Sequence, residues 1–147
     1  MEKLKSLIQD YITYAGNLRE ETASVKSVLG LWDREIYDAG HKTFDKAVED
    51  WVKAFAQEQP SQEELLEALE CILFAAVGCE EKASFWYLTA VQRHCTHLIP
   101  LLEDDSRKAL LEKFETHYPP GRRLPMQKEL HQLLKKEEKK KRFFLFR

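Results

Sequence analysis

The stretch PSQEELLEALECILFAAVG, residues 60–78, decides the fold of this chain. Ser61 is followed three residues later by Glu64, the capping-box arrangement in which each side chain binds a backbone N–H at a helix start. The residues that follow are apolar on more than one side of a helix (Leu65, Leu66, Ala68, Leu69, Cys71, Ile72, Leu73, Phe74, Ala75, Ala76 and Val77). Such a helix needs several neighbours to cover it. We therefore predict a central helix that begins after Ser61 and is closed by Gly78.

Three helices are predicted on the N-terminal side of the central one. Apolar residues recur at steps of three and four from about Glu2 to Ala15, and again from Leu18 to Ile36. Gly16-Asn17 is expected to stop the first helix, and Gly40, within Asp38–His41, to end the second. Thr43 is expected to cap the third, whose apolar stripe consists of Phe44, Ala47, Val48, Trp51 and Phe55.

Three more helices are predicted after the central one. The first runs from about Lys82 along a stripe that includes Val91, Cys95 and Leu98, and Pro100 should kink or shorten its end. The next begins at Asp104 with Ala109, Leu110, Leu111 and Phe114 as its apolar positions, and the breaker Tyr118-Pro119-Pro120-Gly121 follows it. The last opens at Leu124-Pro125-Met126 and carries Leu130, Leu133 and Leu134 into a charged run at Lys135.

This pattern predicts an all-α fold. Short connections favour a compact bundle of six to seven antiparallel helices. Helix pairs of this length can also stack as a short helical-repeat solenoid, which is the alternative architecture, although no copied motif recurs at a fixed period.

The charge is distributed unevenly along a chain whose length suits one domain. The net charge is −2, but residues 1–121 carry 13 Lys and Arg against 22 Asp and Glu, a net of −9, whereas residues 122–147 carry ten against three, a net of +7. We interpret residues 1–121 as an acidic helical body and residues 122–147 as a basic C-terminal helix with an aromatic tail, both in the same domain. The asymmetry predicts an electrostatic partner, or neutralisation of one part by the other.

The location expected from the sequence is the cytoplasm. The longest apolar run, Cys71–Gly78, is far too short to span a bilayer, and the first residues open an amphipathic pattern and lack the apolar core of a signal peptide. The cysteines Cys71, Cys79 and Cys95 are odd in number and lack C-x-x-C spacing, so reduced thiols are expected.

Motifs for catalysis or for bound groups are not evident. Cys71, Cys79, His94, Cys95 and His97 are residue types that zinc prefers, but Cys95 lies about 100° around the helix from His94 and Cys71 lies inside an apolar helix, so we expect no metal site. Phosphate-binding, metalloprotease and serine-hydrolase motifs are missing, and only five glycines are present. We therefore predict no catalytic residues, no cofactor and no small-molecule substrate. Arg34 and His41 match the Arg-x4–6-His pattern of some helical RNases, which leaves a small RNase as a third-ranked alternative.

Two surfaces are predicted to bind a partner. Trp86, Arg93 and His97 recur at helical steps beside the core stripe, and Trp and Arg are enriched where binding energy concentrates at interfaces. Another helix of the bundle covering Trp86 is the alternative interpretation. The second surface is the basic-aromatic tail, residues 139–146: Lys139, Lys140, Lys141, Arg142, Phe143, Phe144, Leu145 and Phe146.

The basic-aromatic tail decides the functional prediction. Large apolar side chains next to cations suit an apolar groove with acidic surroundings, on a protein partner, on another copy of the chain or on the acidic body itself. Nucleic acid is an alternative partner through the tail, although the −9 body counts against broad binding, and a membrane surface is less favoured. We predict a non-enzymatic protein–protein interaction module, such as an adaptor, small subunit or inhibitor-like partner. The alternative is a nucleic-acid-associated helical subunit of a larger complex.

Overall fold

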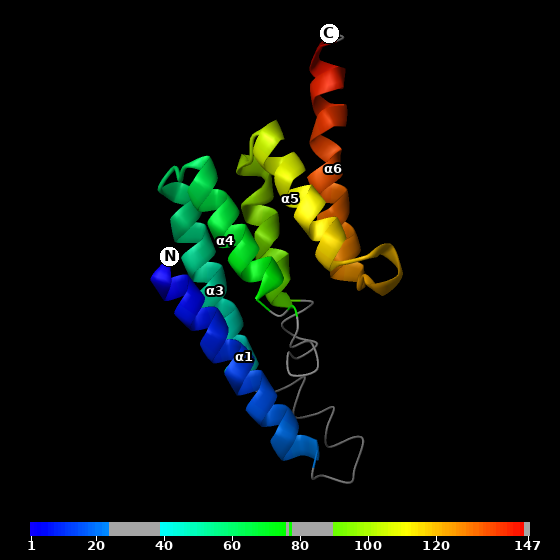
Figure 1. The fold of residues 1–147 in the computed structure, drawn as a ribbon. Helices are drawn as coiled ribbons and strands as arrows, with labels where there is room; N and C mark the ends of the chain where they lie inside the picture. The colour runs from blue at the N-terminus through cyan, green and yellow to red at the C-terminus, as the bar shows by residue number, and fades with distance from the viewer. Residues whose placement is uncertain (24–38, 76, 78–89, 146–147) are drawn as a thin grey trace.

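The computed structural model describes residues 1–23, 39–75, 77 and 90–145, and each regular element in this part of the chain is helical. The predicted all-α class is confirmed. The elements are α1 (Glu2–Ala23), α3 (Ala39–Gln57), α4 (Gln62–Phe74), η2 (Gln92–His97), η3 (Ile99–Leu101), α5 (Asp104–His117), η4 (Pro120–Arg122) and α6 (Pro125–Leu145). In Figure 1 the ribbon descends along α1, ascends along α3 and descends along α4, and α6 ascends beside the descending α5. No helix of this described part is long and apolar enough to cross a membrane.

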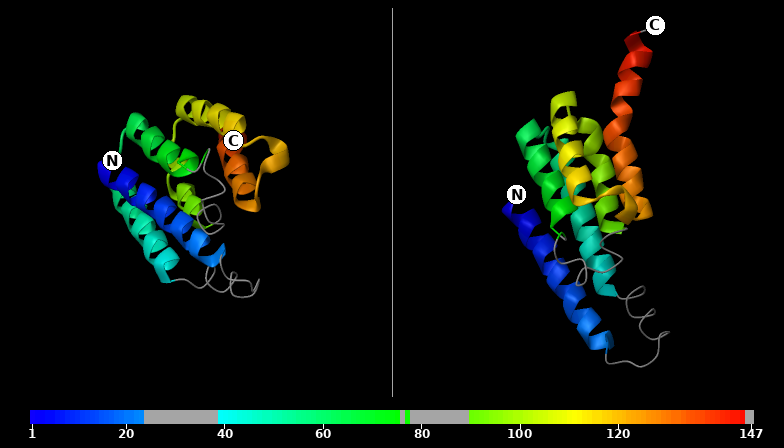
Figure 2. Two further views of the ribbon diagram at one scale, coloured as in Figure 1. Left: turned by 60° about the horizontal axis from the view of Figure 1, so that its bottom comes forward. Right: turned by 45° about the vertical axis from the view of Figure 1, so that its right-hand side comes forward.

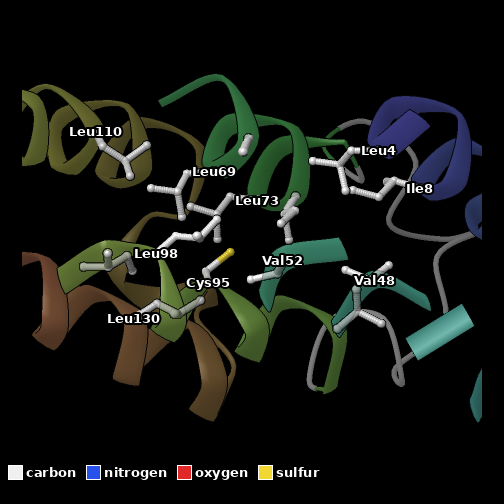
Figure 3. Packing of buried hydrophobic residues seen from close by; sticks show 14 of the residues in the cluster. Leu4, Ile8, Val48, Val52, Leu69, Leu73, Cys95, Leu98, Leu110 and Leu130 are labelled. Carbon is white, nitrogen blue, oxygen red and sulfur yellow. The ribbon is translucent and has the colours of Figure 1, made fainter. Parts of the chain in front are cut away.

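One apolar core joins the N-terminal and C-terminal helices. It includes Leu4 and Ile8 of α1, Leu69 of α4, Cys95 of η2 and Leu130 of α6, all of them at most 1% exposed (Figure 3). Helix α4 contacts α1, α5 and η2, which confirms the predicted central position of the most apolar helix. Because Leu130 and Leu134 belong to the same cluster as Leu4, the first part of the basic C-terminal helix packs on the core of the acidic body.

Helix α1 is longer than the sequence predicts. The expected stripe is confirmed, since Leu4, Ile8, Tyr11 and Ala15 are buried. The stop at Gly16-Asn17 is wrong, because the helix continues to Ala23. A glycine inside a helix costs only about 1 kcal/mol relative to alanine, and a long helix can absorb that cost. The helix predicted from Leu18 to Ile36 therefore begins inside α1, and residues 24–38 lie outside the described part.

Helix α3 begins earlier than predicted. It starts at Ala39, so Gly40 lies in its first turn and does not end a preceding helix, and Thr43 lies inside the helix and is not its cap. The physical reason is the burial of His41, whose Nδ1 lies 3.0 Å from the hydroxyl oxygen of Tyr11 on α1. This contact between the two helices stabilises a helical backbone before Thr43.

The start of α4 confirms the predicted capping box. The Glu64 N–H donates to Ser61 Oγ at 3.1 Å, and the Ser61 N–H donates to Glu64 Oε1 at 3.1 Å. The hydrogen bonds from Ser61 hold the pKa of the Glu64 carboxyl below its ordinary value. The predicted closure at Gly78 lies outside the described residues, and the helix as described ends at Phe74.

Replacing Ser61 with alanine is expected to lower the free energy of unfolding by about 0.5–2 kcal/mol, because it removes the acceptor of an otherwise unpaired helix N–H. Urea denaturation followed by circular dichroism measures the change. The matched control is Ser61→Asp, which retains a capping acceptor and should remain close to the wild type. Equal stability of Ser61→Ala and Ser61→Asp would contradict this role.

The described part of the next segment is not the α-helix that the sequence predicts. Residues 92–97 form the 3₁₀ helix η2, and Pro100 lies in η3, a second short 3₁₀ helix. The described positions Val91, Cys95 and Leu98 of the predicted stripe are nevertheless buried. A 3₁₀ helix has three residues per turn and is uncommon over long stretches, so tertiary packing and not local sequence selects it here.

The C-terminal helices follow the predicted boundaries. Helix α5 starts at Asp104 and ends at His117, directly before the predicted breaker, and α6 begins at Pro125. Leu110 and Phe114 are buried as expected. Ala109 is exposed, which corrects its assignment to the apolar face. Arg107 takes a place on that face and is 1% exposed.

Candidate functional site

The basic-aromatic tail continues the backbone of α6 beyond the body. The last side chain of α6 that is buried in the core among the described ones is Leu134, and the helical backbone then runs through Lys139–Arg142, Phe143 and Phe144 to Leu145. Figure 1 and the right view of Figure 2 show this half of α6 extending past the ends of the other helices. Phe146 lies outside the described residues. The structure thus places the described positions of the tail on one continuous helix.

Arg107 fastens α6 at the turn where it leaves the body. Its guanidinium donates from Nη1 to the carbonyl oxygen of Leu134 at 2.7 Å and from Nη2 to Asp104 Oδ1 at 3.0 Å. Asp104 is about one third exposed, whereas Arg107 is buried. A planar guanidinium can hold two acceptors in fixed directions, which a lysine cannot do. The side chain therefore ties α5 to the last packed turn of α6.

A buried polar cluster fixes the beginning of α6 in the same way. Gln92 Nε2 donates to the carbonyl oxygen of Leu73 and to the Tyr118 hydroxyl, both at 3.2 Å, and the Tyr118 hydroxyl donates to the same carbonyl. Gln127 Nε2 donates to Gln92 Oε1 at 2.6 Å, and Gln127 Oε1 accepts from the Leu124 N–H at 2.8 Å. The cluster thus joins the ends of α4 and α5 to η2 and to the first turn of α6.

These polar residues were not predicted, although a signal was present. Gln127 precedes Leu130 and Leu134 by three and seven residues, and Arg107 stands at the same steps from Leu110 and Phe114. Each therefore occupies a position of the apolar stripe. A polar side chain on such a stripe indicates a buried group with dedicated hydrogen-bond partners.

The predicted surface of Trp86, Arg93 and His97 is only partly described. Trp86 lies outside the described residues, and Arg93 and His97 are exposed on η2. In a 3₁₀ helix, residues four apart diverge by about 120°, whereas residues three apart are aligned. Accordingly the rings of His94 and His97 stack at 6.5 Å, and His94 Nε2 lies 2.5 Å from Asp45 Oδ1 of α3. The structure thus separates Arg93 from His97 and groups His97 with the buried His94.

The thiols and the residues of the RNase pattern are placed as follows. Cys95 is fully buried, and this burial raises the pKa of its thiol far above the ordinary value; burial also raises the pKa of the half-buried Cys71. Cys79 and Arg34 lie outside the described residues. His41 is buried beside Tyr11 inside α3. Within residues 1–23, 39–75, 77 and 90–145, no group of three or more His, Cys, Asp or Glu residues is arranged to hold a metal ion.

A groove between α1 and α3 was not predicted. It consists of two adjoining hollows of about 570 and 380 Å³, which share Lys3, Trp51 and Ala54. We call it the α1/α3 groove. Leu7 contributes from α1, and Trp51 is half-buried with its ring stacked on that of Phe55 at 4.7 Å. The groove therefore presents an aromatic and aliphatic floor.

Carboxylates surround this floor. The lining side chains include Asp10, Asp50, Glu58, Glu64 and Glu67, against one basic side chain, that of Lys3. Asp50 pairs with Lys46 at 2.9 Å and Glu67 pairs with Lys5 at 3.0 Å, both between exposed groups. Exposed pairs of this kind contribute at most about 1 kcal/mol, so an incoming cation can replace them.

His131, on α6, gives the fold a dependence on pH. Burial lowers the pKa of His131, and the positive charges of Arg123 and Lys135 act in the same direction, while Glu115, 3.5 Å away, opposes them. Below the ordinary pKa of 6.5, His131 of the unfolded chain takes up a proton, whereas His131 of the native protein is protonated only at a lower pH. The contribution of His131 to stability therefore falls as the pH decreases through 6.5.

The predicted result for His131→Gln is a flatter pH profile. Urea denaturation between pH 5 and 8 should show a smaller loss of stability toward acid in the variant than in the wild type, because one native-state group that rejects a proton is gone. The exposed His117, replaced in the same manner, serves as control. A profile for His131→Gln that is as steep as the wild-type profile would contradict the assignment.

Comparison with protein-family models, with curated proteins and with solved structures found no significant match to this chain.

Proposed function

We propose that this chain is a non-enzymatic protein–protein interaction module that binds through the basic-aromatic tail. An adaptor, a small subunit or an inhibitor-like partner fits this description, and the cytoplasm is the proposed location. The observation that carries the proposal is the path of α6, whose backbone leaves the core after Leu134 and continues as a helix through the tail.

The chemistry of the tail supports a partner with an apolar groove. Phe143, Phe144 and Phe146 follow four consecutive cationic residues. Full burial of a phenylalanine side chain stabilises by about 1.5–3 kcal/mol before ordering costs, so three phenylalanines constitute a substantial driving force for docking. The neighbouring cations favour an acidic surface and accelerate its encounter. A helix that presents apolar side chains to a groove is a recurrent means of protein recognition.

The test replaces all three phenylalanines with serine in the full chain. We expect Phe143→Ser, Phe144→Ser and Phe146→Ser together to abolish association, measured by light scattering on the purified chain and by lysine cross-linking with mass spectrometry in cell extract. Circular dichroism should remain unchanged. The control is Leu101→Ser, which removes an apolar side chain that is 43% exposed elsewhere on the surface and should preserve association.

Two results would contradict the proposal. One is a triple variant that associates as the wild type does. The other is tight, salt-dependent binding of a labelled 30-nucleotide single strand, measured by fluorescence anisotropy, that requires the tail and is accompanied by no protein association at all. This second result would establish the nucleic-acid alternative, because phosphate contacts are lost as salt rises.

A further inference from the structure

We propose that the basic-aromatic tail of one copy occupies the α1/α3 groove of a second copy. This inference rests on the proposed function and names the partner. It joins two surfaces that the fold leaves in different places, an apolar groove with an acidic rim and a cationic helix that ends in aromatic residues.

The chemistry of the two surfaces is complementary. Five carboxylates and one lysine side chain line the groove, whereas Lys139–Arg142 supply four positive charges in succession. The stacked rings of Trp51 and Phe55 offer an aromatic floor for an incoming phenylalanine. Tryptophan in a partly covered hollow is also the residue type that most often concentrates binding energy at an interface.

The helical path of the tail places its cationic positions next to its aromatic ones. On a helix, Lys139 and Lys140 lie within one turn of Phe143 and Phe144, so cationic and aromatic positions occupy neighbouring parts of one surface. From Leu134 to Leu145 the helix extends about 16 Å, at 1.5 Å per residue. This length provides three turns for a neighbouring molecule.

The groove of the same copy is poorly placed to receive the tail. Helix α6 packs on α5 and η2, whereas α1 packs on α3 and α4. In Figure 1 and in the right view of Figure 2, α1 and α6 lie on opposite sides of the body, and the end of α6 extends away from it. A second copy meets no such restriction. If each tail enters the groove of the other copy, the result is a closed two-fold dimer with two equal contacts.

Charge reversal with rescue tests the contact. Asp10→Lys with Glu58→Lys alters the rim, and Lys140→Glu with Lys141→Glu alters the tail; these rim residues are exposed, so folding should be preserved. We expect the wild type to have the mass of two chains in sedimentation experiments. Each double variant alone should have a dimer dissociation constant at least tenfold higher than that of the wild type. An equimolar mixture of the two double variants should form a dimer again. Glu112→Lys, an exposed reversal on α5, should leave the dimer unchanged.

Cross-linking identifies the copy that supplies the tail. A carbodiimide joins a lysine to a carboxylate in direct contact, and an equal mixture of ¹⁴N- and ¹⁵N-labelled chains marks each peptide by its origin. Tail-to-groove peptides of mixed label are the expected result. Unmixed label would show that the tail docks on its own body and would overturn the inference.

Failure of the inference can be distinguished from failure of the proposed function. A wild-type chain that is monomeric up to millimolar concentration, or a dimer that survives both charge reversals, overturns docking in a second copy. If a different protein cross-links to the chain in a manner that depends on the three phenylalanines, the proposed interaction module is retained. If neither association depends on them, both ideas fail.

Discussion

Replacing Gln92 with leucine is expected to lower the free energy of unfolding by about 2–4 kcal/mol, although leucine is apolar and of similar size. Gln92 donates to the Leu73 carbonyl and to the Tyr118 hydroxyl and accepts from Gln127, entirely inside the protein. In the variant, the buried Gln127 amide loses Gln92 Oε1 as an acceptor. The Leu73 carbonyl at the end of α4 loses one of its donors. A buried group that loses its partner bears the cost of desolvation without compensation.

A double-mutant cycle separates this mechanism from a simple change of packing. Gln127→Leu should also destabilise, because it removes the same hydrogen bond and the acceptor for the Leu124 N–H at the start of α6. The variant with both substitutions should be more stable than the sum of the two single effects predicts, by about 0.5–3 kcal/mol, since the lost bond is then counted once. Strict additivity in urea denaturation would refute the coupling.

Replacing Arg107 with alanine is expected to destabilise the fold by a similar amount, about 2–4 kcal/mol. The change removes two charge-assisted hydrogen bonds, to Leu134 and to Asp104, and leaves a cavity where the buried stem stood. The effect remains below that of a fully buried ion pair because Asp104, about one third exposed, can return to water.

Two further variants define what Arg107 contributes. Arg107→Lys retains the charge but cannot hold both acceptors in fixed directions, so only part of the stability should return. Glu112→Ala, an exposed change on the same helix, should remain within about 0.5 kcal/mol of the wild type. Full stability of Arg107→Lys, or a loss in Glu112→Ala as large as that in Arg107→Ala, would be incompatible with this explanation.

The sequence predicted those features that depend on neighbouring residues along the chain. The capping box of Ser61 and Glu64 is a local pattern, and the apolar stripes of α1 and α4 follow the helical period, so both were found. Glycine misled the prediction twice. Gly16 lies inside α1, because packing of the helix outweighs a local cost of about 1 kcal/mol, and Gly40 lies in the first turn of α3.

The remaining features depend on contacts between distant segments. The 3₁₀ form of η2, the pair of His94 and Asp45, and the α1/α3 groove arise from elements that are far apart in sequence. Their residue types carry no local signal for these arrangements. The tail was found as a sequence feature, and its continuous helical path beyond Leu134 became visible only with the structure. The roles of Trp86 and Phe146 in binding a partner stay predictions.

The continuity of α6 fixes the rotational phase of the tail relative to the body. Arg107 and the buried cluster around Gln127 hold the packed half of the helix, so the direction of every later position follows from the helical step of about 100° per residue. One alanine inserted after Lys136 would turn the phenylalanines by about 100° while leaving the charge unchanged. Seven inserted residues would return them to within about 20° of their first direction. Under the proposed function, binding through the tail therefore depends on helical phase as well as on residue type.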